Sequence, residues 1–377
     1  MTIRSIEVRT LAPDVERFRY TAFEPEVFTT TTLVRVTDDD GTTGYGAYDS
    51  DSYGDWDRAP LETLRPLVPR LLGLEIDAVE AAEAVLTDDR TSPFPPAVRS
   101  AVDIAMWDAS ARARSVPLRA ALGGDPRVDA LPSYASVALH DDQPTYLEAV
   151  AALVVDGFGA VKLHAWGEPA RDAELIAAVR ARFPSLMLMH DAEGRYDRDG
   201  ADLVARACAD AGVRWLEAPL PDFDLEGYRA LRRRVPGVPV LAAGDALWDP
   251  RLVADVMRDP PWDAVRFDAS FVGGITAARR LMAVAVDAGL DVELISYGHT
   301  VVQAANLHLA LAYGRTTYFE QPVPPEPWEH AVLNPIRTGP DGIARCPVGP
   351  GLGIELDEAA LDRATIARVV AGSAVRT

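Results

Sequence analysis

From about residue 128 onward, short runs of apolar and β-branched residues alternate with longer amphipathic stretches. The longer stretches carry apolar side chains at three- and four-residue spacing, which is typical of helices packed on one face. Gly, Pro or Asp mark most of the joins. We expect helices at Tyr146–Val155, Ala170–Arg182, Ala201–Ala211, Gly274–Ala288 and Val301–Ala312. The predicted strands are Val128–Ser136, Ala160–Trp166, Leu186–Ala192, Val213–Pro219, Val238–Asp245, Trp262–Ser270, Asp291–His299 and Thr316–Pro322.

This alternation of strand and helix predicts a parallel sheet with right-handed crossovers. Eight such units within about 195 residues close into a barrel more naturally than they form an open sheet. We therefore predict an α/β fold, a (β/α) TIM-type barrel over residues 126–345, with an open doubly wound sheet as the alternative.

The first 125 residues have a different pattern, in which strands precede helices. The expected strands are Ile3–Leu11, Thr30–Thr37 and Thr42–Ala47, and the expected helices are Pro60–Leu72, Ala78–Leu86 and Pro96–Ala113. Strands followed by helices predict a separate α+β domain over residues 1–125. The tail, residues 346–377, is too short to fold alone. We expect it to be helical over Glu358–Ala371 and to dock on the first domain.

Composition and charge narrow the class of protein. The chain has 377 residues, 48% of them hydrophobic, and no run approaches 18 uninterrupted apolar residues. Its start lacks the apolar centre of a signal peptide, and two cysteines are too few for a disulfide framework, so we expect the cytoplasm. The net charge of −20 argues against nucleic acid and anionic membranes as partners. Of the 37 basic residues only Lys162 is a lysine. A lysine can release its proton near neutral pH and an arginine cannot, which suggests that Lys162 has a role in proton transfer.

Ionisable side chains stand at the predicted carboxyl ends of seven successive strands, where the chemistry of a βα barrel gathers. Asp191, Glu217 and Asp245 follow strands three to five at intervals of about one βα unit, so they should meet at one rim. Converged carboxylates need a cation, and all-oxygen ligation suits Mg²⁺. The alternative is that they cap helices or form rim ion pairs.

Lys162 and His299, on predicted strands two and seven, would flank such a metal from opposite sides. A metal that holds a substrate carboxylate between two bases is suited to removing the proton α to that carboxylate. Asp268 could fix the tautomer of His299. His164 shares the face of Lys162 and could bind substrate or act on Lys162, and Glu193 shares the face of Asp191 and could bind substrate hydroxyls.

A series of short motifs runs along nearly the whole chain. They are Ala105-Met106-Trp107-Asp108, Leu122-Gly123-Gly124, Val161-Lys162-Leu163-His164, His190-Asp191-Ala192, Leu216-Glu217-Ala218-Pro219, Ala243-Gly244-Asp245, Phe267-Asp268, Gly273-Gly274-Ile275-Thr276, His299, Tyr318-Phe319-Glu320 and Pro350-Gly351-Leu352-Gly353. In this order and spacing the chain resembles the enolase superfamily, and within it the mandelate racemase-like acid-sugar dehydratases.

The resemblance implies a complete set of site roles. These are Mg²⁺ on Asp191, Glu217 and Asp245, a base at Lys162, a His–Asp dyad of His299 and Asp268, and a hydrogen bond from Glu320 to the substrate carboxylate. It also implies a capping domain whose loops, near Asp14–Phe28 and Tyr48–Asp57, close over the barrel and select the substrate.

Three departures from the family pattern matter. The second-strand motif is Lys-x-His where the family most often has Lys-x-Lys, so the base there is either Lys162 or His164. Asp245 stands where Glu is usual, and the surroundings of His299, Gly298-His299-Thr300, are also unusual for the dyad histidine.

The resulting hypothesis is a Mg²⁺-dependent dehydratase that converts a sugar acid into a 2-keto-3-deoxy acid, with His299 as the acid for the departing hydroxyl. A racemase, epimerase or lactone cycloisomerase would use the same enolate, and a non-catalytic, metal-stabilised binding barrel is the alternative from another class. We expect a small-molecule carboxylate as partner and a homo-oligomeric assembly.

Overall fold

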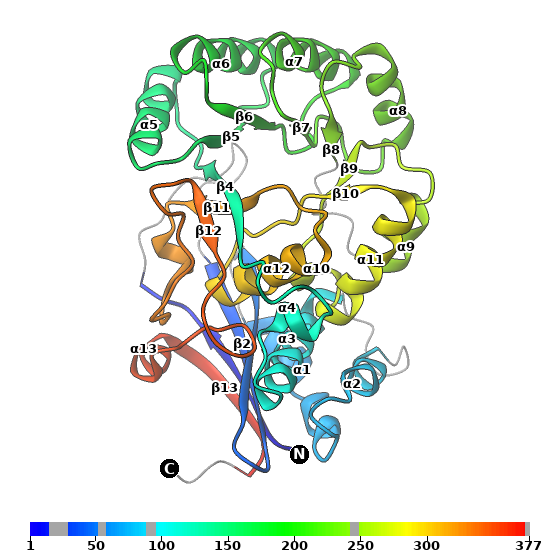
Figure 1. Cartoon of the computed structure of the whole chain (residues 1–377), viewed down its shortest axis with the longest axis vertical. Coiled ribbons are helices and arrows are strands. Elements are labelled where there is room, and N and C mark those ends of the chain that lie inside the picture. The colour runs from blue at the N-terminus through cyan, green and yellow to red at the C-terminus, as the bar shows by residue number, and fades with distance from the viewer. Residues whose placement is uncertain (15–28, 52–57, 88–95, 242–248, 374–377) are drawn as a thin grey trace.

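The computed structural model describes residues 1–14, 29–51, 58–87, 96–241 and 249–373. Its two parts are a four-stranded sheet with helices and a larger ring of strands and helices stacked on it (Figure 1). The predicted barrel with an N-terminal α+β capping domain is confirmed, whereas the exact boundaries at residues 125 and 345 stay predictions. No helix in the described ranges is long and apolar enough to cross a membrane.

The capping sheet has the antiparallel order β13-β1-β2-β3, with β1 (Ile3–Leu11), β2 (Thr29–Asp38) and β3 (Thr43–Asp51). Helix α3 (Pro96–Ala113) packs directly on β3. A Cβ at Gly44 would lie 2.3 Å from the carbonyl oxygen of Ala105, and one at Gly46 would lie 2.0 Å from that of Ala101. These two glycines therefore set how closely helix and strand can approach.

The smaller helices of the capping domain complete its apolar core. They are α1 (Ala59–Leu64), η2 (Val68–Leu71), α2 (Val79–Leu86) and α4 (Leu118–Ala121). The single helix expected at Pro60–Leu72 is instead α1 followed by the 3₁₀ turn η2. Pro66 and Pro69 lack the amide hydrogens that a continuous helix would need.

The expectation of a helix over Glu358–Ala371 is wrong in its second half. Helix α13 (Glu358–Ala364) ends early, and Thr365–Gly372 forms strand β13, which pairs antiparallel with β1. Burial alternates along β13, and β-branched residues such as Ile366 and Val369 suit a strand better than a helix. The tail thus returns to the capping domain, as expected, but as an edge strand of its sheet.

The ring of parallel strands runs in the order β10-β9-β8-β7-β6-β5-β4-β11. These strands are β4 (Ala130–Val137), β5 (Ala160–His164), β6 (Met187–Asp191), β7 (Leu216–Glu217), β8 (Val240–Leu241), β9 (Ala264–Val265), β10 (Asp291–Val292) and β11 (Phe319–Val323). A backbone hydrogen bond from Val292 N to Arg315 O, 3.1 Å, links β10 to the segment before β11. A short strand, β12 (Ile343–Arg345), pairs antiparallel with β4.

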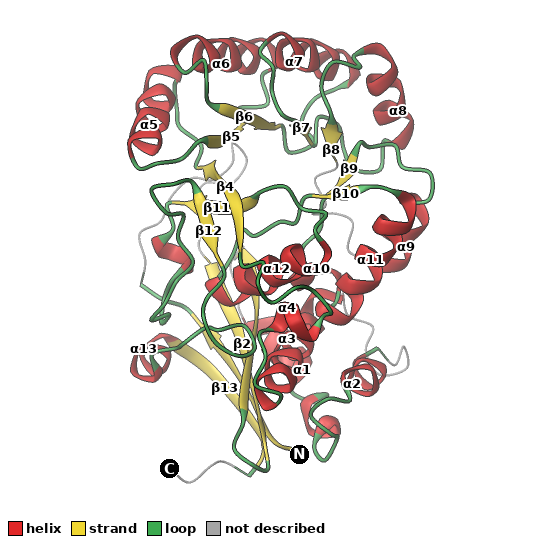
Figure 2. Ribbon diagram, in the orientation of Figure 1, coloured by secondary structure: helices red, strands yellow, loops and turns green. Residues whose placement is uncertain are grey.

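Helices cover the outside of this ring (Figure 2). They are α5 (Gln143–Val155), α6 (Pro169–Arg182), α7 (Arg198–Asp210), α8 (Leu225–Arg234), α9 (Pro250–Val256), α10 (Ala269–Val272), α11 (Ile275–Ala288) and α12 (Thr300–Tyr313), with the 3₁₀ turn η3 (Glu326–Trp328) after β11. Inside the ring a separate apolar cluster includes Tyr134, Met189 and Trp215. The barrel is therefore filled by side chains below the level of its charged residues.

Polar contacts fix the capping domain on the barrel. The indole Nε1 of Trp107 on α3 donates to Thr276 Oγ1 at 2.8 Å, and Asp103 Oδ1 accepts the backbone N–H of Thr276 at 3.0 Å. On β3, Asp49 Oδ2 accepts the backbone N–H of His299 at 2.6 Å. The capping domain thus touches the segments that follow β9 and β10, where two of the expected site residues lie.

Candidate active site

A buried group of charged side chains fills the barrel above the apolar cluster, and we call it the Lys162 cluster: Lys162, Asp191, Glu217, Arg266 and Glu320. The Nζ atom of Lys162 lies 3.1 Å from Asp191 Oδ2, 3.2 Å from Glu217 Oε1 and 2.9 Å from Glu320 Oε1. Lys162 is only 2% exposed. The structure therefore brings together four of the side chains that the sequence singled out, from β5, β6, β7 and β11.

Strand register explains this convergence. His164 at the end of β5 pairs with Asp191 at the end of β6, and Asp191 pairs with Glu217 at the end of β7. Neighbouring parallel strands in register place these three side chains in one row across the barrel mouth. Lys162, two residues before His164, points to the same side from one layer below.

Arg266 was missed by the sequence reasoning. It follows β9 directly and is 1% exposed. Its Nε lies 2.8 Å from Glu217 Oε1, its Nη2 lies 3.0 Å from Glu320 Oε2, and its Nη1 donates to Tyr134 Oη at 3.2 Å. Nothing in the local sequence marks Arg266, because arginine also fills the surface cation positions of this chain.

The position of Glu193 differs from the expectation that it shares one strand face with Asp191. Strand β6 ends at Asp191, and Glu193 has a positive φ of 50°, so the two side chains do not alternate as on a continuing strand. Glu193 instead donates its backbone N–H to Asp191 Oδ1 at 3.0 Å. That bond fixes the carboxylate of Asp191 from the loop side.

His164 is fully buried beside Asp191. Its Nδ1 lies 2.6 Å from the carbonyl oxygen of Val137, and its Nε2 lies 3.6 Å from Asp191 Oδ2. The carbonyl requires a proton on Nδ1, which leaves a lone pair on Nε2 facing the cluster. Burial lowers the pKa of His164 to about 4 despite the nearby Asp191, so the ring is neutral at pH 7.

The charges of the cluster act on one another. Burial lowers the pKa of Lys162, but Glu217 and Glu320 outweigh it and raise that pKa well above its ordinary value. The carboxylates of Glu217 and Glu320 therefore favour the charged form of this ammonium group. Burial alone raises the pKa of Glu320. Lys162 and Arg266 lower this pKa by more than burial raises it, so that the net shift is downward.

Asp268 and His299 do not form the expected dyad. Both lie past the ends of their strands, as the N-caps of α10 and α12. Asp268 Oδ1 accepts from Ser270 N at 2.6 Å and from Asn306 Nδ2 at 2.8 Å. His299 Nε2 lies 3.0 Å from the carbonyl oxygen of His330, and its Nδ1 accepts from Val301 N at 3.3 Å. Both ring nitrogens of His299 thus have partners other than Asp268.

Burial of this second group disfavours the charged form of both side chains. Burial lowers the pKa of His299 to about 4 and raises the pKa of Asp268 to about 7. The imidazolium that dehydration would use as its acid is therefore disfavoured in this arrangement. Asp49 of the capping domain lies next to the same group, and a Cβ at Gly298 would come within 2.7 Å of its Oδ2, so only glycine leaves room for this contact.

The donor set at the end of β6 and β7 fits Mg²⁺. Asp191 and Glu217 each direct a carboxylate oxygen to within 3.2 Å of one atom, Lys162 Nζ, so both border the same space. Hard carboxylate oxygens are the ligands that Mg²⁺ prefers. The third predicted ligand, Asp245, lies outside the described residues. Among those that are described, no three His, Cys, Asp or Glu side chains form a metal-binding group.

Two other features have structural roles. The Gly273-Gly274 pair precedes α11, but Asp103 of the capping domain occupies that helix end, within 2.3 Å of where a Cβ of Gly274 would lie. His308 is buried between the domains, with Nδ1 accepting from Arg119 N at 3.0 Å. Neither feature is free to bind a ligand.

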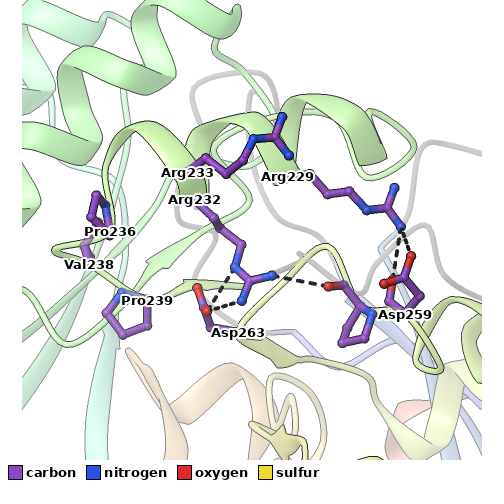
Figure 3. Close-up of a pocket in the computed structure, with 9 residues that line it drawn as sticks. Arg229, Arg232, Arg233, Pro236, Val238, Pro239, Asp259 and Asp263 are labelled. Carbon is purple, nitrogen blue, oxygen red and sulfur yellow. Dashed lines mark hydrogen bonds and ion pairs between the residues drawn. The ribbon is translucent and has the colours of Figure 1, made fainter.

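A separate hollow of about 600 Å³ lies beside α8, and its lining shares no residue with the Lys162 cluster (Figure 3). Arg229 and Arg232, which line it, are paired with Asp259 and Asp263, at 3.0 and 2.6 Å. With these arginines paired to neighbouring carboxylates, we assign the chemistry to the cluster in the barrel.

Three relatives of known activity match much of the chain. Muconate cycloisomerase 1 of Rhodococcus opacus is 28% identical over 93% of this chain and 96% of its own length. N-succinylamino acid racemase of Amycolatopsis sp. is 30% identical over 73% of each chain. L-talarate/galactarate dehydratase of Salmonella typhimurium is 31% identical over 63% of this chain and 56% of its own. Relatives of this chain thus include cycloisomerases, racemases and acid-sugar dehydratases.

Solved structures share the whole fold. A chain from Pseudovibrio sp. assigned to the mandelate racemase/muconate lactonizing enzymes superposes with a TM-score of 0.93 at 31% identity, covering 99% of both chains. L-talarate dehydratase from Polaromonas sp. JS666, crystallised with Mg and L-glucarate, gives a TM-score of 0.85 at 24% identity, again over 99% of both. The second comparison supports the fold alone.

Two family models divide the chain as the structure does. The N-terminal domain of mandelate racemase/muconate lactonizing enzymes matches residues 5–123, and the enolase C-terminal domain-like model matches residues 145–360. Together with the barrel, its capping sheet and the converged carboxylates, these matches identify the chain as a member of the enolase superfamily, of the mandelate racemase-like type.

Proposed function

We propose that this chain is a Mg²⁺-dependent enzyme that removes the proton α to a carboxylate and dehydrates a sugar acid to a 2-keto-3-deoxy acid. The observation that carries this proposal is the position of Lys162. Its ammonium group is buried among Asp191, Glu217 and Glu320 at the barrel mouth. An amine next to two metal-type ligands is suited to proton transfer at a substrate carbon.

Each residue of the proposed site would have its own role in this reaction. Asp191 and Glu217, with Asp245, would hold Mg²⁺, which binds the substrate carboxylate and stabilises the charge that develops on it. Lys162 or His164 would take the α-proton, since both side chains lie beside Asp191. For Lys162 this requires the neutral amine, which the charge of a bound Mg²⁺ would favour. Glu320 would contact the substrate carboxylate, and Glu193 would stand close enough to bind hydroxyls.

The dehydratase assignment draws its support from the relatives. L-talarate/galactarate dehydratase is 31% identical where it aligns. A sugar acid is therefore the substrate class we infer for this chain.

The test is a screen of acid sugars with the purified chain and MgCl₂. Formation of a 2-keto acid and exchange of the α-proton in D₂O are measured on each compound. We expect both signals on at least one sugar acid, and both should disappear on chelation. A chain that binds Mg²⁺ but shows neither signal on any carboxylate would favour the non-catalytic barrel.

A second candidate, an isomerase, is favoured by a specific observation. Dehydration needs an acid for the departing hydroxyl, yet His299 is turned to the carbonyl of His330 and is not paired with Asp268. Racemisation and cycloisomerisation need no such leaving-group acid, and the cycloisomerase relative matches 93% of the chain. Exchange of the α-proton without formation of a 2-keto acid would identify this case.

A further inference from the structure

Arg266 closes a ring of alternating charges inside the barrel. Glu217 and Glu320 each contact both cations: Lys162 lies 3.2 and 2.9 Å from them, and Arg266 lies 2.8 and 3.0 Å from them. The two oxygens of Glu320 are divided, with Oε1 on the lysine and Oε2 on the arginine. Each carboxylate is thus held from two directions.

The two cations of this ring are not equivalent. Lys162 also reaches Asp191, at 3.1 Å, and so borders the space where the metal would sit. Arg266 is not ion-paired with Asp191 in the described structure. Its third nitrogen, Nη1, donates to Tyr134 Oη at 3.2 Å, toward the apolar filling of the barrel. Arg266 therefore supports the site from beneath, whereas Lys162 belongs to it.

The position is unusual for an arginine of this chain. Most of its ion-paired arginines are partly or largely exposed, as with Arg234 on α8, whose side chain is 42% exposed and pairs with Asp202 through two nitrogens at 2.7 Å. Arg266 is 1% exposed. Burying a guanidinium is costly unless its surroundings bind it in a defined geometry, and only the fork of an arginine can reach two carboxylates and a hydroxyl at once.

We propose that Arg266 is a positioning residue that holds Glu217 and Glu320 at a fixed separation across the barrel and thereby sets the affinity of the site for Mg²⁺. Glu217 comes from β7 and Glu320 from β11, which are not neighbours in the sheet. The guanidinium spans the barrel between them. This inference rests on the proposed function, in which Glu217 is a metal ligand.

The test is titration of the metal-free full chain with MgCl₂ by isothermal calorimetry. Arg266→Lys keeps the charge but cannot bridge both carboxylates, so we expect Mg²⁺ to bind roughly 10-fold more weakly or worse, as is typical when a partner of a metal ligand is lost. Arg234→Lys, a matched change in a two-nitrogen ion pair on the outer surface, should bind Mg²⁺ like the wild type. If Arg266 acted only through its charge, Arg266→Lys would also match the wild type, and that result would overturn the proposal.

If Arg266→Lys does not fold, a second variant tests the same proposal. Tyr134→Phe removes the hydroxyl that anchors Nη1 and leaves every charge in place, so we expect about threefold weaker Mg²⁺ binding, a fraction of the strength of one hydrogen bond to a charged group. Unchanged binding in Tyr134→Phe would then overturn the proposal. A wild type that binds Mg²⁺ but acts on no sugar acid refutes the dehydratase function alone, because the calorimetry needs no substrate.

Discussion

The two sides of the barrel mouth are built differently. On the side of β5, β6 and β7, His164, Asp191 and Glu217 are the last residues of regular strands in mutual register. On the side of β9 and β10, Asp268 and His299 lie beyond the strand ends as helix N-caps. The first side forms a connected charged cluster, whereas the second consists of two separately anchored side chains.

This difference shows what fixes a side chain at a barrel rim. Strand register fixes the first group, because neighbouring strands share their hydrogen bonds and side chains alternate strictly. Local capping fixes the second group: Asp268 accepts from Ser270 N, and His299 from Val301 N. The second group is therefore held by its own local hydrogen bonds and not by the register of neighbouring strands.

The largest expected effect is on the strand-register side. Glu217→Gln removes a charged oxygen from the proposed Mg²⁺ site, and loss of several kcal/mol of charge stabilisation corresponds to at least about 10³ in turnover. Turnover and Mg²⁺ content are measured together, with Glu226→Gln, an exposed glutamate on α8, as control. Full activity with full metal content would contradict the assignment of Glu217.

His299→Asn tests the side of the barrel mouth next to β9 and β10, where the side chains are helix N-caps. If His299 is the acid for the departing hydroxyl, dehydration should fall by about 10² to 10⁴, the usual contribution of a positioned acid. Asp268→Asn, measured in parallel, should lose as much only if the two residues pair during turnover. Normal formation of 2-keto acid by the His299 variant would remove this histidine from the mechanism.

Lys162→Arg separates charge from proton transfer on the strand-register side. Arginine keeps its proton at neutral pH, so substrate binding should persist while turnover falls by about 10² or more. The comparison is α-proton exchange in Lys162→Arg and in His164→Gln. Exchange retained in the first variant and lost in the second would assign the base to His164.

The smallest effect concerns stability. Burial raises the pKa of Asp268 from 3.8 to about 7, so the folded chain binds this proton more tightly than the unfolded chain. The stability that this proton gives to the folded chain is present at low pH and is lost as the pH rises from about 4 to about 7. The free energy of unfolding, measured with urea, should fall more between pH 5 and pH 8 for the wild type than for Asp268→Asn. Equal losses would mean that Asp268 is ionised in the folded chain at both pH values.

Much of this architecture could be predicted from the sequence. Helix α3 and strand β1 have the predicted bounds, Pro96–Ala113 and Ile3–Leu11. Lys162, Asp191, Glu217 and Glu320 also converge as expected, since strand ends in a barrel must meet. These predictions depend on periodicity, which the sequence carries directly.

What could not be predicted depends on long-range packing. The tail after Ala364 turns into β13 because β1 offers a free edge, and no local pattern reveals that edge. Arg266 is one arginine among 36, and only the carboxylates around it distinguish it from surface arginines. The partners of Asp268 and His299 depend on Asn306 and His330, which lie 31 or more residues away.

The pairing of β1 with β13 has a consequence for how the protein is made. Ser5 lies opposite Gly372, so β1 waits until β13 has been synthesised before the capping sheet is complete. Domains generally fold as units during synthesis, and here the barrel lies entirely between the two halves of its neighbour. The barrel can therefore form before the sheet that covers it, and a chain stalled near residue 360 would leave the edge of β1 exposed to other unfinished chains.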